Sequence, residues 1–556
     1  MKPLLTLLFL SLFCFSFSLK GQKDELREKV EALQSIIQDV DTGKETYEQN
    51  LSFDEDRPYL VTFSVKEIDS KGRTESHEYT FNLAFLEERL IRRVSSRSEM
   101  SVELKTGRED LIFETEDGEP EGYTDEFAIR NQGVDNAREI EPLVKEIIPL
   151  AAKVWKADNQ LQNNFGVILE WLATNINTVE MGDTRVSQTL EQSAEIADRF
   201  FFYYESMEDG EQEETGKYNL SLGDLDEKNI DFDIKGTEVY LSIPTDGKRD
   251  FIEYTEGEEE TEYVSSIDFF FSTPGAAKLA QEALEMFIPL CREKIQQRMP
   301  DTGDQAPQLL AQAISDFNKG EVEVNQSLVG NCQVVYQRQL AEGGSEENTL
   351  FTFHLEDLAT EEIEIDVEDY WVGLELETRD SKDYIQIQED GELQNYEDKL
   401  TFFADGVENA RLIMYLLPAA VEQCQRTVQG RDLAWLSEQL AQIEQQTEEY
   451  GQQLETAEGD SCKAIFTLTE FGRNTSNSVY EFNWADLSVK RMEMDIRGTE
   501  IQLDLKTNNN DKIINLYEDD EELEYTDELT FLLPNVEAAK VSMATIQAQI
   551  KTCSRK

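Results

Sequence analysis

The chain has 556 residues, of which 116 are acidic and 51 basic, giving a formal net charge of −65 at pH 7. We expect no nucleic-acid partner, because binding phosphates requires clustered Lys and Arg, and no anionic membrane surface, because like charges repel. Hydrophobic residues make up 39% of the chain, enough to build cores, so the charge indicates a solvated, self-repelling surface, with weak divalent cation binding as the alternative.

Residues 1–21 are predicted to be a cleaved signal peptide. Lys2 supplies a positive charge, and the apolar run over residues 4–17 is too short to span a bilayer comfortably. The apolar run continues past Cys14, so we interpret this cysteine as part of the discarded signal and not as a lipoprotein anchor. We therefore expect a periplasmic or secreted protein.

One sequence pattern recurs four times in the rest of the chain. A strand motif reads YTFNLAFL from Tyr79, YNLSLGDL from Tyr218, FTFHLEDL from Phe351 and YEFNWADL from Tyr480. The period of roughly 130 residues is long enough for a self-sufficient domain. We predict four repeat domains, called copies one to four, over residues 22–157, 158–299, 300–428 and 429–556.

Each copy is expected to open with an amphipathic helix, because apolar residues recur there at helical spacing. The four helices are predicted over Lys23–Val40, Leu161–Ile176, Leu309–Phe317 and Leu433–Tyr450. Strands with alternating apolar residues follow, and in copy four Tyr480, Phe482 and Trp484 should point inward.

The strand motif closes with Asp-Leu in three copies, which we interpret as an Asx-type turn followed by a buried leucine. The three acids are Asp224, Asp357 and Asp486. Phe85 takes this place in copy one, which argues against a catalytic or metal-binding role for the Asp. The last helix carries an alanine in register in every copy: Ala137, Ala277, Ala410 and Ala539.

The order of helix, six or seven antiparallel strands and closing helix resembles the pleckstrin-homology-like superfold. The resemblance rests on element order alone, without signature residues. It implies an α+β fold in which each copy is a small sheet or barrel closed by its C-terminal helix. Such a superfold implies no particular function.

Copies three and four carry cysteines at equivalent positions, one on the first strand and one in the closing helix. Copy one lacks both, and export favours oxidation, so the two positions are expected to form a bridge. We predict the disulfides Cys332–Cys424 and Cys462–Cys553. Cys291 of copy two has no cysteine at the partner position and is expected to be a buried thiol, with an intermolecular bridge as the alternative.

No catalytic, cofactor-binding or metal-binding residue stands out. The chain has two histidines, and His354 lies at an outward position of its strand motif, so it is expected on the surface. Neither histidine belongs to a catalytic triad or a zinc-binding or nucleotide-binding motif, and the carboxylates are too abundant to single out a pair. A recurring tyrosine is expected in the core of each copy, in preference to an exposed role in glycan stacking: Tyr123, Tyr263, Tyr396 and Tyr525.

The leading hypothesis is a non-enzymatic binding or scaffold protein of the cell envelope or extracellular space. Its ligand would be an unidentified protein or glycan, and tandem copies would raise avidity for repeated epitopes. A carboxylate-dependent hydrolase with a site in one copy and a structural spacer without ligand are the alternatives. No cofactor is expected.

Overall fold

The computed structural model describes residues 20–96, 99–182, 184–208, 210–257, 261–319, 322–342, 344–361, 363–367, 371–447, 449–473, 475–518 and 521–555. The predicted signal peptide lies outside these residues, apart from positions 20 and 21, which are helical. No helix in the described part of the chain is long and apolar enough to cross a membrane. The chain divides into two compact units, Met1–Arg298 and Met299–Lys556.

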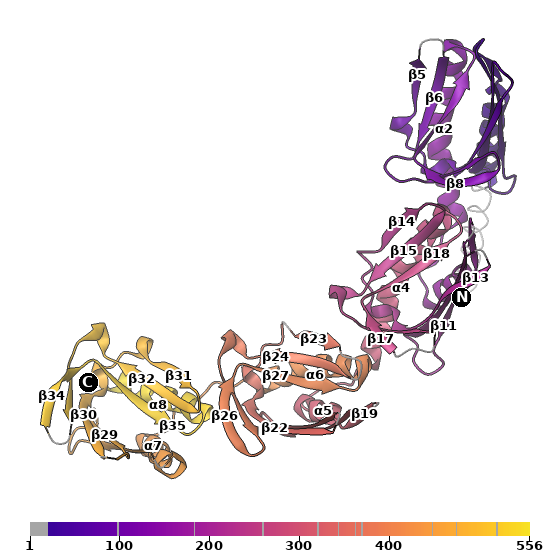
Figure 1. The fold of residues 1–556 in the computed structure, drawn as a ribbon. Helices are drawn as coiled ribbons and strands as arrows, with labels where there is room; N and C mark the ends of the chain where they lie inside the picture. The colour runs from indigo at the N-terminus through magenta and orange to yellow at the C-terminus, as the bar shows by residue number, and fades with distance from the viewer. Residues whose placement is uncertain are drawn as a thin grey trace, which may run out of the picture. The chain divides into compact units, whose positions relative to one another are not determined.

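The structure is mixed α+β, and the strand pairs are antiparallel (Figure 1). Each copy was expected to form one sheet or barrel of six or seven strands, but its described strands form two separate sheets. In copy one, a helix over residues 20–36 precedes a six-stranded and a three-stranded sheet, and α2 (Val134–Asp158) follows them. The six-stranded sheet has the order β1 (Val40–Asp41), β2 (Glu45–Phe53), β3 (Leu60–Asp69), β4 (Thr74–Asn82), β7 (Ile112–Glu116) and β8 (Glu119–Thr124). The three-stranded sheet has the order β5 (Arg92–Ser96), β6 (Glu99–Lys105) and β9 (Glu126–Asn131).

Copy two has the same order of elements. It begins with α3 (Phe165–Asn175) and ends with α4 (Pro274–Arg298). Its six-stranded sheet runs β10 (Val179–Met181), β11 (Thr184–Gln192), β12 (Arg199–Glu208), β13 (Glu211–Ser221), β16 (Ile252–Glu256) and β17 (Thr261–Val264). Its three-stranded sheet runs β14 (Asp231–Lys235), β15 (Glu238–Pro244) and β18 (Ser266–Phe271).

Copy three begins with α5 (Ala306–Ala313) and ends with α6 (Gly406–Cys424). Its larger sheet runs β19 (Phe317–Lys319), β20 (Val322–Gly330), β21 (Gln333–Glu342), β22 (Ser345–His354), β25 (Ile385–Glu389) and β26 (Glu392–Glu397). Its smaller sheet runs β23 (Glu364–Val367), β24 (Val372–Glu377) and β27 (Lys399–Ala404).

Copy four begins with α7 (Leu433–Thr447) and ends with α8 (Val536–Cys553). Its larger sheet has five strands, β28 (Tyr450–Thr456), β29 (Lys463–Glu470), β30 (Ser476–Asn483), β33 (Ile514–Glu518) and β34 (Glu521–Thr526). Its smaller sheet runs β31 (Glu493–Arg497), β32 (Glu500–Lys506) and β35 (Glu528–Leu533).

The closing helix of each copy packs on the three-stranded sheet, where α2 contacts β6, α4 contacts β15, α6 contacts β24 and α8 contacts β32 (Figure 1). The alanine in register is fully buried in every closing helix. A methyl group at this position lets the helix approach the sheet closely, which explains why a small residue recurs there.

Three of the buried clusters show where the cores of copies one, two and four lie. One is contained in copy one and one in copy two. A third fills copy four and also includes Tyr396 of copy three. The expected inward set of copy four is confirmed at Phe482 and Trp484, which are buried, whereas Tyr480 is half-buried.

Three predicted opening helices are too long at their C-terminal ends. Val40, Phe317 and Tyr450 were expected to be helical, but they begin β1, β19 and β28. Val40 and Phe317 are buried there. The apolar spacing of the helix continues into a short strand that covers the same core, so spacing alone could not locate the boundary.

The Asx-type turn was assigned to the wrong residue. Each strand motif ends in a short 3-10 helix: η1 (Leu83–Phe85), η3 (Leu222–Asp224), η5 (Leu355–Asp357) and η7 (Trp484–Asp486). Asn82, His354 and Asn483 cap three of these helices by accepting a backbone N–H two residues later, at 2.9, 3.2 and 2.9 Å. The cap is therefore three residues before the Asp, and the leucine after the Asp is buried as expected.

Candidate functional site

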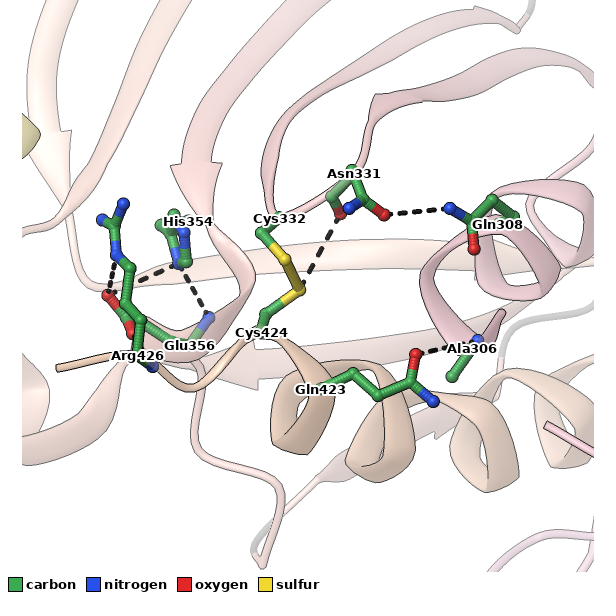
Figure 2. Close-up of a disulfide and its surroundings, with 9 residues drawn as sticks. All are labelled: Ala306, Gln308, Asn331, Cys332, His354, Glu356, Gln423, Cys424 and Arg426. Carbon is green, nitrogen blue, oxygen red and sulfur yellow. Dashed lines mark hydrogen bonds and ion pairs between the residues drawn. A yellow bond between two sulfur atoms is a disulfide. The ribbon is translucent and has the colours of Figure 1, made fainter. Parts of the chain in front are cut away.

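The structure places both predicted cysteine pairs at disulfide distance. The Sγ atoms are 2.11 Å apart in Cys332–Cys424 (Figure 2). They are 2.14 Å apart in Cys462–Cys553. The first cysteine of each pair was expected on the first strand, but it lies in the turn before the second long strand. The second cysteine is the last residue of the closing helix. Each link therefore joins the end of the closing helix to the sheet of its own copy.

In copy two the same place holds an ion pair and a thiol. Cys291 is buried and free, and burial, with the nearby Asp198 carboxylate adding to it, raises the pKa of this thiol. Asp198 is itself buried and is held by Arg298 at 2.9 Å. A buried thiol with a raised pKa is a poor nucleophile, so Cys291 is a packing residue.

Copies three and four contact each other through a cluster of charged side chains. The ammonium of Lys540, in the second turn of α8, donates to both carboxylate oxygens of Asp357 at 2.5 and 2.6 Å. Arg426, just beyond α6, donates to Glu356 at 3.1 Å and also bonds Glu537 of α8. Every acid in this cluster therefore has a basic partner, and both ion networks tie copy three to the start of α8.

His354 lies at the centre of this cluster, which corrects its predicted surface position. Its side chain is only 3% exposed. Strand β22 ends at this residue, and the imidazole turns inward to accept the backbone N–H of Glu356, beside Arg426 (Figure 2). Burial, reinforced by the positive charge of Arg426, lowers the pKa of His354 to about 4, so the ring is neutral at pH 7.

Asp357 is the other titratable group buried here. Burial raises the pKa of its carboxyl group, and the charge of Lys540 opposes that rise. A cavity of about 420 Å³ lies between these residues and the first turn of α8, lined also by Tyr384, Tyr396 and Asn535. The cavity is thus part of the boundary between two copies.

Copies one and two meet in the same way. A cavity of about 540 Å³ is lined by Phe85, Leu111 and Tyr123 of copy one and by residues 273–276 at the start of α4. Strand pairing shows that these positions correspond to Asp357, Tyr384, Tyr396 and the start of α8 in the second unit. Lys278, at the position of Lys540, pairs with Glu109 of copy one at 2.6 Å.

Backbone contacts repeat at this boundary as well. The Tyr396 amide donates to the carbonyl of Gly498 at 3.2 Å. At the corresponding place in the first unit, a Cβ added to Gly122 would lie 2.9 Å from the carbonyl oxygen of Gly236. Gly122 has φ +115°, so only glycine fits this close approach without strain.

We name the two halves of this interface by their residues. The socket comprises three positions. In copy three they are Asp357, which ends the 3-10 helix, Tyr384, which precedes the fourth long strand, and Tyr396, the recurring tyrosine. In copy one the residue that ends the 3-10 helix is aromatic instead of acidic. The plug comprises the first two turns of the closing helix, as in Val536–Lys540. Each unit contains one socket occupied by one plug.

The recurring tyrosine belongs to the socket, and its predicted place in the core of its own copy is wrong. Tyr123 packs on the core of copy two, and Tyr396 belongs to the core of copy four. Burial raises the pKa of both to about 12, so they stay protonated. Tyr263 is half-buried, whereas Tyr525 of copy four is 52% exposed. Tyr123 and Tyr396 contact the core of the next copy within their unit, so their burial depends on that neighbour.

Glu75, His77 and Glu116 form a second cluster, with one ligand atom from each within 4.8 Å of the others. His77 lies 2.9 Å from Glu75 and 3.2 Å from Glu114. Burial lowers the pKa of His77, whereas the carboxylates of Glu75 and Glu114 raise it. The net effect is a raised pKa. The residues form an ion pair on the sheet surface, and we assign no metal to them.

No family model matches the chain, and no curated protein or solved structure resembles it at a significant level. Sequence reasoning missed the residues of the plug. The signal was present, because all four closing helices carry a base directly after the buried alanine: Arg138, Lys278, Arg411 and Lys540.

Proposed function

We propose that this is an exported, non-enzymatic binding or scaffold protein of the cell envelope or extracellular space. In this proposal the four copies, at the boundaries stated above and with pleckstrin-homology-like element order, are modules, and the two copies within each unit hold each other in a fixed arrangement. Its ligand is a protein or a glycan.

The observation that carries the proposal is the repeated docking mode. Copy two docks on copy one, and copy four docks on copy three, through equivalent residues in both units. The side chains at the contact differ between the units: Phe85 and Leu111 give an apolar contact in one, and Asp357 and Tyr384 a charged one in the other. The two contacts use equivalent positions but different side chains. This favours a role in which the arrangement of the two copies within each unit matters more than the chemistry of the contact.

The charged cavity of the second unit does not favour a hydrolase. Hydrolysis by paired carboxylates needs one free carboxylate and one free acid beside a substrate. Asp357 is bonded by Lys540 and Glu356 by Arg426, and both bases come from elements that define the boundary between copies. These contacts stabilise the interface, and two disulfides suit an oxidising compartment.

The proposal is tested by capture and by turnover. The immobilised mature protein should retain a ligand from envelope extract or culture medium, and excess soluble mature protein should compete for it. The same protein, incubated with chromogenic glycosides and esters, should release no product above the blank.

Turnover that disappears in Asp357→Asn would support the hydrolase instead. Absence of both turnover and any competable ligand would leave the structural spacer and contradict a binding role.

A further inference from the structure

The plug of copy one is exposed. Val134 begins α2 at the position of Pro274 and Val536, which are buried against the preceding copy, yet Val134 is 45% exposed. The side chain of Arg138 is 62% exposed, against 14% for the equivalent Lys540. Copy one therefore presents an apolar residue and a base that correspond to buried contacts elsewhere in the chain.

The socket of copy four is exposed as well. Tyr525 is 52% exposed, against 6% for the equivalent Tyr396, which copy four covers. Ile513, at the position of the buried Leu111, is also exposed. Both are among the large hydrophobic residues left exposed on the described surface, and such residues gathered at one place indicate an interaction surface.

The charges of the two exposed halves match those of the occupied interface between copies three and four. Asp357 pairs with Lys540 there, and the corresponding residues are Asp486 in the exposed socket and Arg138 in the exposed plug. Arg426 pairs with Glu537 there, and the corresponding residues are Arg555 and Asp135. Both ion pairs would therefore form with the correct sign if the socket of copy four received the plug of copy one.

We propose that copy four of one molecule binds copy one of a second molecule, head to tail, through the docking mode seen within each unit. The inference rests on the proposed function, because it extends the same docking from copies in one chain to copies in two chains. The two surfaces differ, so the contact is heterologous, and each molecule added to an open chain of molecules exposes a new socket. The product is a head-to-tail assembly.

Net charge sets the condition for observing this assembly. Molecules of charge −65 repel each other at low salt, and at about 0.15 M salt the repulsion is screened beyond about 8 Å. Contacts at about 3 Å within the interface are screened much less. Association should therefore be measured near that ionic strength.

The test is sedimentation velocity and light scattering on the full mature protein over a range of concentrations. The mean mass should rise above that of the monomer as the concentration increases. Arg138→Glu and Asp486→Lys should each weaken association by about tenfold or more, because each places like charges opposite one another. Mixing the two variants should restore assembly, because the introduced glutamate then meets the introduced lysine, and the unchanged Arg138 meets the unchanged Asp486.

The matched control is Arg73→Glu, which reverses the charge of another exposed arginine of copy one. Arg73 pairs with Asp69 in the turn between β3 and β4. This variant should assemble like the wild type. A wild type that stays monomeric up to about 1 mM, or single variants that assemble normally, would each overturn the proposal. Failure of the mixed variants to assemble, or a different exported protein occupying the Tyr525 surface, would also overturn it.

Asp357→Lys, measured in the same series, separates this proposal from the proposed function. A lower melting temperature in Asp357→Lys with a monomeric wild type would refute self-association alone. An unchanged melting temperature would refute the docking between copies on which both proposals depend.

Discussion

Replacing His354 with Asn should make the second unit more resistant to acid. Asn occupies the equivalent position in copies one and four, where Asn82 and Asn483 cap the same turn by accepting a backbone N–H at 2.9 Å. His354→Asn therefore keeps the cap to Glu356 and removes only the group that titrates. The folded structure at pH 7 should be unchanged.

The size of the effect follows from the pKa of the buried imidazole. The ordinary pKa is about 6.5, and in the folded protein it is about 4. The unfolded chain therefore binds a proton before the folded one, so stability is lost as the pH falls from about 6.5 towards 4 and is unaffected above that range. At about 1.4 kcal/mol for each pKa unit, the loss is at most about 3.5 kcal/mol.

Protonation of Asp357 affects stability with the opposite sign. Its raised pKa means that the folded state takes up a proton first, which favours folding as the pH falls. This carboxyl group is present in both the wild type and His354→Asn. The difference between the two proteins therefore isolates the histidine.

The assay is urea unfolding followed by tryptophan fluorescence between about pH 7 and 4. Above about pH 6.5, the urea midpoints of the wild type and His354→Asn should differ by a constant amount. Below that pH, the midpoint of the wild type should decrease faster than that of the variant. His77→Gln is the control of opposite sign, because the pKa of His77 is raised and its loss should weaken the protein at acid pH. Parallel curves for wild type and His354→Asn would refute the reasoning.

Three further outcomes are expected. Lys540→Met should destabilise the second unit by about 3–5 kcal/mol, because it leaves Asp357 buried without its base. Lys278→Met, at the equivalent and more exposed ion pair, should cost at most about 1 kcal/mol. Equal shifts in the urea midpoints of the two variants would contradict this. Non-reducing peptide mapping should recover the two cysteine pairs within copies three and four, and a bridge joining different copies would contradict the fold. The melting temperature should rise between low and ~1 M sodium chloride, as screening reduces self-repulsion.

Within one copy, the α+β class and the alternation of strands were predictable, because core positions recur at the spacing that each element imposes. The cysteine positions followed from the same alignment of copies. The ends of the helices could not be predicted, because Val40 and Phe317 continue the helical spacing into a strand. The cap of the 3-10 helix could not be predicted either, because His354 continues the strand alternation into a turn. In each case a residue changes element without leaving the core.

The interface between copies could not be predicted from the sequence for a different reason. A residue that recurs in every tandem copy can be retained by folding or by docking, and both keep the same residue at the same offset. Burial separates the two, because a folding residue is buried in every copy and a docking residue only where a neighbour covers it. Ala137 and its equivalents are buried in all four copies, whereas Tyr396 is buried and Tyr525 exposed. A recurring tyrosine that is exposed in the last copy is therefore evidence of a binding surface, and its partner is expected to resemble the start of a closing helix.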